Sequence, residues 1–479
     1  MKYYFTRYLA VYPVALLYML QDSEYRLSSY FKWLARTKDF RTVMKRRTVD
    51  YTPKIKLLRM VLWALWLVTN IAVAVLIVIS YLSLNYWYGI AAIILLLILP
   101  YILAYGITIP LVLGRIFIQK PQEKKMIEAA REILSHHSAV RIGVAGSYGK
   151  TTMKEILKTV LSQGKIVAAT PGNMNTAIGI SRFAKKLTGK EEVLVIEYGE
   201  EHAGDVLELA KLTDPNVGVI TGINEAHLVS FKTLETTINT IFGLADYIGD
   251  KGKVYKNGES LLVATKVAAH DPYVFSQKGV DGWKVTDAKT SINGTTFTAT
   301  RDNVTIHAQT KLLGLHTIGV TVAAIAIAHD LGLTKKQIEQ GLSNVIPFEH
   351  RMEPRNLHDA WIVDDTYNGN SEGVKVGLEL LAQLKAKRRI YVTPGLVEQG
   401  SKTTSVHETI GAQAAEVADV VVLMQNSVTE HIVKGLEAAG FKGDLLIIDD
   451  PLEFYTNLDH FVAAGDVVLM QNDWTDNYQ

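Results

Sequence analysis

Two long stretches without a charged residue constrain the fold of this chain more than any other feature. The first runs from residue 60 to about residue 84, and the second from about residue 86 to residue 113. A helix needs roughly 20 apolar residues to cross a hydrocarbon layer about 30 Å thick, and both stretches exceed that length. A core helix of a soluble protein would carry polar residues along one face, and neither stretch does. We therefore expect two transmembrane helices, joined near Asn85 as a hairpin.

Basic residues flank the predicted hairpin on both sides: Lys54, Lys56 and Arg59 before it, and Arg115, Lys120, Lys124 and Lys125 after it. Because cytoplasmic flanks are rich in Lys and Arg, we expect the N-terminus and everything after the hairpin on the cytoplasmic side. The apolar run from Tyr8 to Leu20 is too short to span, so it should lie in the interface or pack on the hairpin. Residues 23–56 are basic and aromatic, which is typical of a flank meeting anionic lipid head groups. A groove for a phosphate-bearing lipid is the alternative.

A glycine-rich loop between a predicted strand and a predicted helix indicates a phosphate site. The strand, residues 139–145, leads into Gly146-Ser147-Tyr148-Gly149-Lys150-Thr151-Thr152, and the helix follows directly. Backbone N–H groups and the helix N-terminus present partial positive charge to a polyphosphate. Lys150 adds a full charge, and the Thr151 hydroxyl can ligate Mg²⁺. The spacing departs from the ordinary G-x-x-x-x-G-K-[ST] motif, because Val144 stands where its first glycine would be.

Two further predicted strands should end beside this loop. Residues 192–196 lead to Glu197, and residues 217–220 lead to Asn224 and His227. Ligands of an open α/β sheet bind at the carboxyl ends of its strands, so Lys150, Thr151, Glu197 and His227 should converge on one crevice. Oxygen ligands such as Thr151 and Glu197 suit Mg²⁺, while His227 would be a less usual partner. Alone, Glu197 and His227 would each be ordinary surface or loop residues; their common position favours a site.

Composition narrows the chemistry. The chain has no cysteine, which excludes disulfides, thiolate nucleophiles and cysteine-based zinc sites. Its formal net charge of +2 gives no reason to expect a nucleic-acid partner.

A P-loop transport ATPase is disfavoured, because two helices make no translocation path.

The remaining pattern predicts an α/β chain in three parts. Residues 283–312 alternate polar and apolar around Asn293-Gly294 and Asp302-Asn303, which predicts β-hairpins. From about residue 347, apolar strands alternate with helices again, which predicts a second doubly wound sheet. We therefore expect a membrane region (1–120), a P-loop α/β ATPase domain (121–346) and a Rossmann-like α/β domain (347–479).

Further motifs follow the phosphate loop in sequence order: Asn173-Met174-Asn175-Thr176-Ala177-Ile178-Gly179, Glu197-Tyr198-Gly199 with Gly204-Asp205, Asn224-Glu225-Ala226-His227-Leu228, Gly314-Leu315-His316-Thr317, Arg351-Met352-Glu353, Asp364-Asp365-Thr366-Tyr367-Asn368-Gly369-Asn370 and Pro394-Gly395-Leu396-Val397-Glu398-Gln399-Gly400 with His407. Together with the loop, they resemble the Mur ligases, the ATP-dependent ligases that build the peptide of peptidoglycan. The likeness is nearest to the type that adds D-alanyl-D-alanine to UDP-N-acetylmuramoyl-tripeptide, and it covers residues from about 120 to 479.

The resemblance implies ATP and Mg²⁺ as cofactors and an acyl phosphate as intermediate; together with the predicted hairpin and its basic flanks, it leads us to expect this chemistry on the cytoplasmic face of a bacterial membrane. It assigns catalysis to Lys150, Glu197, His227 and Arg351, and the metal to Thr151, Glu197 and His227. The nucleotide would contact residues 146–152, His316, Arg351 and Asp365, and substrate would contact Asn173, Asn175, Asn368 and Glu398. The partners would be a UDP-linked or lipid-linked muramoyl peptide, an amino acid or dipeptide, and membrane lipid.

The sequence departs from the family pattern at several positions, and the departure at Ile241 gives the best support to a second hypothesis. The family's carbamylated lysine, fourteen residues after the histidine, corresponds here to Ile241. The His-Asn pair near the adenine is His316-Thr317. The predicted hairpin stands where the family has a UDP-binding domain, which makes a lipid-linked precursor worth considering. The alternative to a ligase is therefore a nucleotide-binding pseudo-ligase that scaffolds wall synthesis at the membrane.

Overall fold

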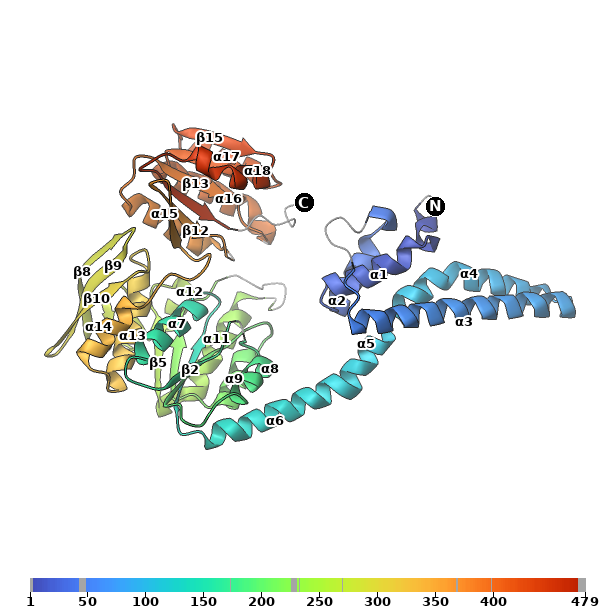
Figure 1. The fold of residues 1–479 in the computed structure, drawn as a ribbon, viewed down its shortest axis with the longest axis horizontal. Helices are drawn as coiled ribbons and strands as arrows, with labels where there is room; N and C mark the ends of the chain where they lie inside the picture. The colour runs from blue at the N-terminus through green and yellow to red at the C-terminus, as the bar shows by residue number, and fades with distance from the viewer. Residues whose placement is uncertain are drawn as a thin grey trace. The chain divides into compact units, whose positions relative to one another are not determined.

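The computed structural model describes residues 3–42, 49–172, 174–224, 231, 233–268, 270–367, 369–397 and 399–472. The chain forms two compact units, Met1–Lys125 and Met126–Gln479. Figure 1 shows the first as helical and the second as two α/β domains. Each unit is described separately.

The first unit is built around two long apolar helices. α3 (Pro53–Ser83) begins with Thr52 as N-cap and Pro53 at its first position, which places its start before the uncharged stretch. α4 (Tyr86–Gly106) follows a tight turn at Leu84 and Asn85 and packs antiparallel to α3 (Figure 1). The remaining elements are η1 (Tyr4–Tyr8), α1 (Val11–Asp22), α2 (Leu27–Arg36), η2 (Phe40–Thr42), α5 (Ile109–Gly114) and η3 (Arg115–Gln119). The predicted second stretch, 86–113, is therefore divided between α4 and α5.

Tyrosine hydroxyls of the N-terminal segment donate hydrogen bonds to backbone carbonyls of α4. Tyr12 donates to the Pro100 carbonyl at 3.0 Å and Tyr30 to the Ala104 carbonyl at 2.9 Å. Pro100 lacks an N–H and so cannot bond the carbonyl one turn earlier; Tyr8 donates to that Leu96 carbonyl at 3.0 Å. The short apolar run from Tyr8 therefore packs on the hairpin, one of its two predicted positions.

The second unit begins in α6 (Lys120–His136) and continues with a six-stranded parallel sheet of order β2-β3-β1-β4-β5-β6. Its elements are β1 (Val140–Ala145), α7 (Lys150–Leu161), β2 (Val167–Ala169), α8 (Ala177–Ala184), β3 (Val193–Glu197), α9 (Asp205–Thr213), β4 (Val217–Ile220), α11 (Leu234–Ile248), η4 (Gly249–Lys251), β5 (Lys253–Asn257), α12 (Leu261–Ala264) and β6 (Val274–Phe275). Strand residues alternate between two apolar clusters, one shared with α7 and one with α8, α9 and α11. Covered on both faces, the sheet leaves its strand ends for ligands.

An antiparallel sheet and two helices complete this domain. The sheet, of order β10-β9-β8-β7, contains β7 (Gly279–Val280), β8 (Trp283–Ser291), β9 (Gly294–Arg301) and β10 (Val304–Thr310), and the helices are α13 (Thr317–Asp330) and α14 (Lys335–Ser343). The hairpins predicted over 283–312 are confirmed. α13 is buried along nearly its whole length and packs on α7, which fixes the helix that begins at Lys150.

The last domain has a six-stranded sheet of order β11-β12-β16-β13-β14-β15. Its elements are β11 (Glu353–Leu357), β12 (Ala360–Asp365), α15 (Ser371–Gln383), β13 (Arg389–Thr393), η5 (Gly400–Lys402), α16 (Thr403–Val417), β14 (Val420–Met424), α17 (Thr429–Ala438), β15 (Asp444–Ile448), α18 (Pro451–Thr456), α19 (Leu458–Phe461) and β16 (Val467–Gln471). The five strands after β11 are parallel, as the sequence predicts, and β11 pairs antiparallel at the edge.

Candidate functional site

The loop between β1 and α7 folds against the end of β4. Gly146 and Gly149 have φ angles of 146° and 78°, which a side chain disfavours. A Cβ at Gly146 would also collide with Thr221 Oγ1, and the Ser147 N–H donates to the Gly222 carbonyl at 2.6 Å. The glycines are therefore needed for the loop to close on its neighbour, leaving Lys150 and Thr151 at the start of α7.

Lys150 pairs with a buried carboxylate that follows β3. Its Nζ lies 2.9 Å from both carboxylate oxygens of Glu200 and also donates to the Gly146 carbonyl. Glu200 is 5% exposed. Burial raises the pKa of Glu200 to about 7, although the Lys150 ammonium acts to lower it.

Glu197, the last residue of β3, lies in a second buried ion pair. Its Oε2 is 3.2 Å from Nζ of Lys154, which is fully buried and donates to the Gly172 carbonyl at 2.8 Å. Asn175 Nδ2 donates to Glu197 Oε1 at 3.2 Å, so the structure places Asn175 on the carboxylate. Oε2 accepts no hydrogen bond from the described residues. A carboxylate oxygen that lacks a hydrogen bond and the Thr151 hydroxyl at the start of α7 are oxygen ligands of the kind that Mg²⁺ accepts, so Glu197 and Thr151 fit that ion by their chemistry.

Arg351 and Asp365 belong to the last domain. The Arg351 guanidinium lies over the Tyr367 ring, 4.5 Å from its centre. Asp365 ends β12 and accepts from Gln471 Nε2 at 2.9 Å. Burial raises the pKa of Asp365 to about 7, while Gln471 and Arg351 act to lower it. Arg351 is therefore close enough to Asp365 to influence its charge.

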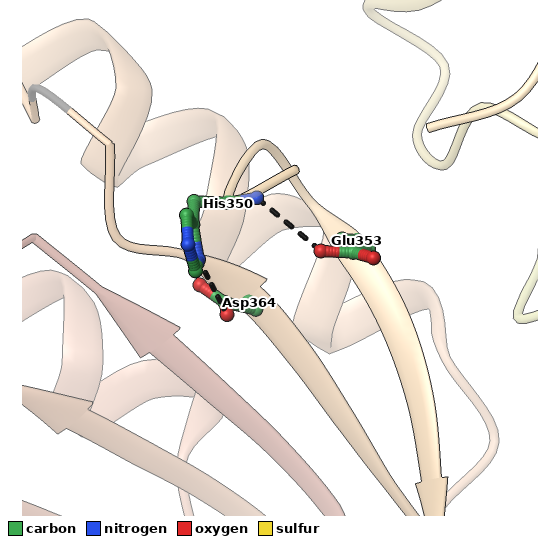
Figure 2. Close-up of side chains that lie close together, drawn as sticks. All are labelled: His350, Glu353 and Asp364. Carbon is green, nitrogen blue, oxygen red and sulfur yellow. Dashed lines mark hydrogen bonds and ion pairs between the residues drawn. The ribbon is translucent and has the colours of Figure 1, made fainter. Parts of the chain in front are cut away.

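Beside them, His350, Glu353 and Asp364 bring three potential ligand atoms within 4.8 Å of one another (Figure 2). Asp364 Oδ2 is 2.9 Å from His350 Nδ1 and 2.9 Å from Arg355 Nη2, and Glu353 Oε2 is 3.0 Å from the same Arg355 nitrogen. Both carboxylates already have a cationic partner. We interpret this cluster as an ion-pair network that ties β11 to β12, not as a metal site.

Two family models match the sequence. The model described as Mur ligase middle domain matches residues 144–328, and the model described as Mur ligase, glutamate ligase domain, matches residues 350–471. The phosphate loop and Glu197 lie in the first match, and Arg351 and Asp365 in the second. The chain belongs to the Mur ligase family.

Curated relatives are similar to this Mur ligase over part of its length. A UDP-N-acetylmuramoyl-tripeptide–D-alanyl-D-alanine ligase of Mycobacterium tuberculosis is 28% identical over 294 residues, covering 59% of this chain and 58% of the relative. The Escherichia coli enzyme of the same name is 25% identical over 304 residues, covering 62% and 67%. The chain thus spans well under the full length of the curated relatives it matches.

Solved structures show the same fold. The MurF ligase of Thermotoga maritima in complex with ADP has a TM-score of 0.62 and 25% identity, covering 73% of this chain and 80% of that one. MurF of Acinetobacter baumannii has a TM-score of 0.63 and 21% identity, covering 73% and 77%. The mixed α/β fold expected from the sequence is confirmed for the region after the apolar helices.

The structure brings some predicted site residues of this Mur ligase together. The loop residues, Lys150 and Glu197 meet at the carboxyl ends of the adjacent strands β1 and β3. His316 lies at the start of α13, where burial lowers its pKa to about 4, so it is neutral there. Four predicted residues lie outside the described ones: Asn173, His227, Asn368 and Glu398. Their roles stay predictions.

Ile241, which corresponds to the family's carbamylated lysine, packs in the apolar core. Ile241 is fully buried on α11, in the apolar cluster shared with α8 and α9. It therefore supplies no ligand to the site.

Sequence reasoning missed Glu200 and Lys154. Lysine and glutamate are rarely buried in proteins, so residue type alone gives no reason to place Lys154 or Glu200 in the interior. The available signals were positional: Lys154 follows Lys150 by one helical turn, and Glu200 follows Glu197 at a strand end.

Proposed function

We propose that this Mur ligase is an ATP-dependent amide ligase acting on a peptidoglycan precursor. The observation that carries the proposal is the meeting of the Lys150 loop and the Glu197 carboxylate at adjacent strand ends of a Mur ligase middle domain. The relatives named for D-alanyl-D-alanine addition support a muramoyl tripeptide as acceptor and D-alanyl-D-alanine as the amine.

The reaction we propose transfers the γ-phosphoryl group of ATP to a carboxylate oxygen of the acceptor, with ADP leaving. The amine then attacks the acyl carbon, the C–O bond to phosphate breaks, and phosphate departs with one former carboxylate oxygen. Catalysis of phosphoryl transfer is largely positioning and charge neutralisation. Lys150 would hold the β- and γ-phosphates; Thr151 and Glu197, with the predicted His227, would hold Mg²⁺, which supplies further positive charge when bound.

The remaining roles follow by the same reasoning. Asn175, predicted as a substrate contact, donates a hydrogen bond to Glu197, and we assign it the additional role of orienting that carboxylate. Arg351 offers a cation for phosphate from the last domain, with Asp365 beside it. Asn173, Asn368 and Glu398 are retained as predicted substrate contacts.

We further propose that α3 and α4 anchor the ligase in the cytoplasmic membrane. Both are long and apolar enough to span a bilayer. Large apolar side chains stand exposed along them, among them Trp63, Val68, Ile77, Leu82 and Ile93. Exposed apolar surface on this scale needs a hydrophobic environment. The basic flanks favour a cytoplasmic N-terminus and cytoplasmic catalytic domains. A membrane-bound ligase could take a lipid-linked acceptor as well as a UDP-linked one.

The test is product analysis with full-length protein in membranes. ATP, Mg²⁺, D-alanyl-D-alanine and either UDP-linked or lipid-linked tripeptide are supplied, and the pentapeptide product is sought by mass spectrometry. Pentapeptide should form with at least one of the two acceptors, and each molecule formed should be accompanied by one ADP and one phosphate. Lys150→Ala should lower turnover by at least about 100-fold, since it removes the phosphate-binding charge. An unchanged rate in that variant would refute the phosphate site.

One observation favours the pseudo-ligase alternative. Ile241 is packed in an apolar cluster and cannot bind a cation. If calorimetry shows ATP binding while every acceptor and amine combination fails to give product, the scaffold function gains support over the ligase.

A further inference from the structure

Glu200 has no role in the reaction proposed above, yet it is buried beside the phosphate loop. Both its oxygens lie 2.9 Å from Lys150 Nζ, and the same nitrogen donates to the Gly146 carbonyl. An ammonium group has three N–H donors. In this arrangement Lys150 is directed back onto its own loop and onto Glu200, and is fully occupied.

A nucleotide must therefore displace Glu200 from Lys150. Displacement would leave a carboxylate that is 5% exposed without its cation, next to the carboxylate of Glu197. Buried charges are tolerated when they are paired. The other described cation beside these two carboxylates, Lys154, already contacts Glu197 at 3.2 Å and the Gly172 carbonyl at 2.8 Å. The compensating charge has to come with the nucleotide.

We propose that Glu200 exchanges partners when nucleotide binds: it neutralises Lys150 in the empty site and then becomes a ligand, direct or through water, of the divalent cation that accompanies the phosphates. This inference rests on the proposed nucleotide site. Carboxylate oxygens are ligands that Mg²⁺ prefers, and the neighbouring Glu197, whose Oε2 accepts no hydrogen bond from the described residues and lies 3.2 Å from Lys154 Nζ, offers a second carboxylate to the same ion. Glu200 thus makes nucleotide affinity depend on the metal.

The test measures ADP binding to full-length protein in detergent micelles by calorimetry, with Mg²⁺ and with EDTA. The variants are Glu200→Gln, which removes the charge, Glu200→Asp, which keeps it, and Glu201→Gln, an exposed neighbour as matched control. In Glu200→Gln, metal-free affinity for ADP should rise and the gain from Mg²⁺ should shrink, each by roughly tenfold. Glu200→Asp and Glu201→Gln should keep a large gain from Mg²⁺.

A second readout follows the metal itself. Mn²⁺ affinity of the ADP complex, measured by electron paramagnetic resonance, should fall in Glu200→Gln and stay unchanged in Glu201→Gln. An unaltered Mn²⁺ affinity in Glu200→Gln would overturn the ligand assignment, as would a wild-type gain from Mg²⁺ in that variant. Failure of the wild-type protein to bind ADP under any condition would instead overturn the proposed nucleotide site, so the two failures are distinguishable.

Discussion

Lys154→Met should destabilise the ATP-binding domain far more than an ordinary lysine substitution. The Lys154 side chain is fully buried, its Nζ 3.2 Å from Glu197 Oε2 and 2.8 Å from the Gly172 carbonyl. Methionine keeps the apolar stem but removes the charge, so Glu197, 3% exposed, is left buried without its cation. Breaking a buried ion pair in this way costs roughly 3–5 kcal/mol.

The matched control is Lys158→Met, one turn further along α7. Lys158 is half exposed and pairs only at the surface with Glu155, 3.4 Å away, so its loss should cost less than about 1 kcal/mol. The free energy of unfolding of both variants is measured by urea unfolding of the full-length protein, with hydrogen exchange of the amides in β1 and β3 as the probe. Adding Glu197→Gln to Lys154→Met should recover part of the lost stability, because the unpaired charge disappears. Equal losses in the two lysine variants would refute the reasoning.

Three further predictions concern the loop, the last domain and the helices. Gly146→Ala should abolish ADP binding in calorimetry, since its Cβ would meet Thr221 at a φ of 146°; wild-type affinity would contradict this. His407 is buried, and its Nε2 accepts a hydrogen bond from the Leu396 N–H at 2.9 Å. Burial lowers the pKa of His407, and the nearby His431 acts in the same direction. Because the unfolded chain binds the proton more readily, the stability that neutral His407 contributes is present above pH about 6.5 and is lost as the pH falls below that value. The free energy of unfolding should therefore fall by at most about 1.4 kcal/mol per pH unit from this residue. Denaturation of His407→Gln should show a shallower slope between pH 7 and 5 in urea titrations, and an identical slope would refute the assignment. If α3 and α4 span the membrane as proposed, the full-length protein should remain in the membrane pellet after alkaline carbonate extraction; release into the supernatant would refute the anchor.

The parallel strands were predictable because they are short apolar runs ending in polar residues. β3 and β4, with Glu197 at the end of β3, follow the sequence interpretation closely. The phosphate loop was predictable for the same local reason, since strand, glycines and helix are adjacent in sequence. β11 was not, because Glu353–Leu357 is polar, contains a proline and pairs only at a sheet edge.

The charged interior of the site could not be derived from local pattern. Lys154 lies on a helix and Glu197 on a strand, and only the packing of α7 on the sheet shows that each is buried against the other. The same holds for Lys150 and Glu200. The start of α3 was available in the sequence, since Thr52 and Pro53 are a helix N-cap and first residue, but the uncharged stretch alone placed it later.

The most direct test of the account follows one oxygen atom. Muramoyl tripeptide labelled with ¹⁸O in its acceptor carboxylate is incubated with the membrane-bound protein, ATP, Mg²⁺ and D-alanyl-D-alanine, and the released phosphate is analysed by mass spectrometry. If ATP held at Lys150 activates the carboxylate, one ¹⁸O atom should appear in each phosphate formed. Unlabelled phosphate, released by water alone, would contradict the ligase mechanism.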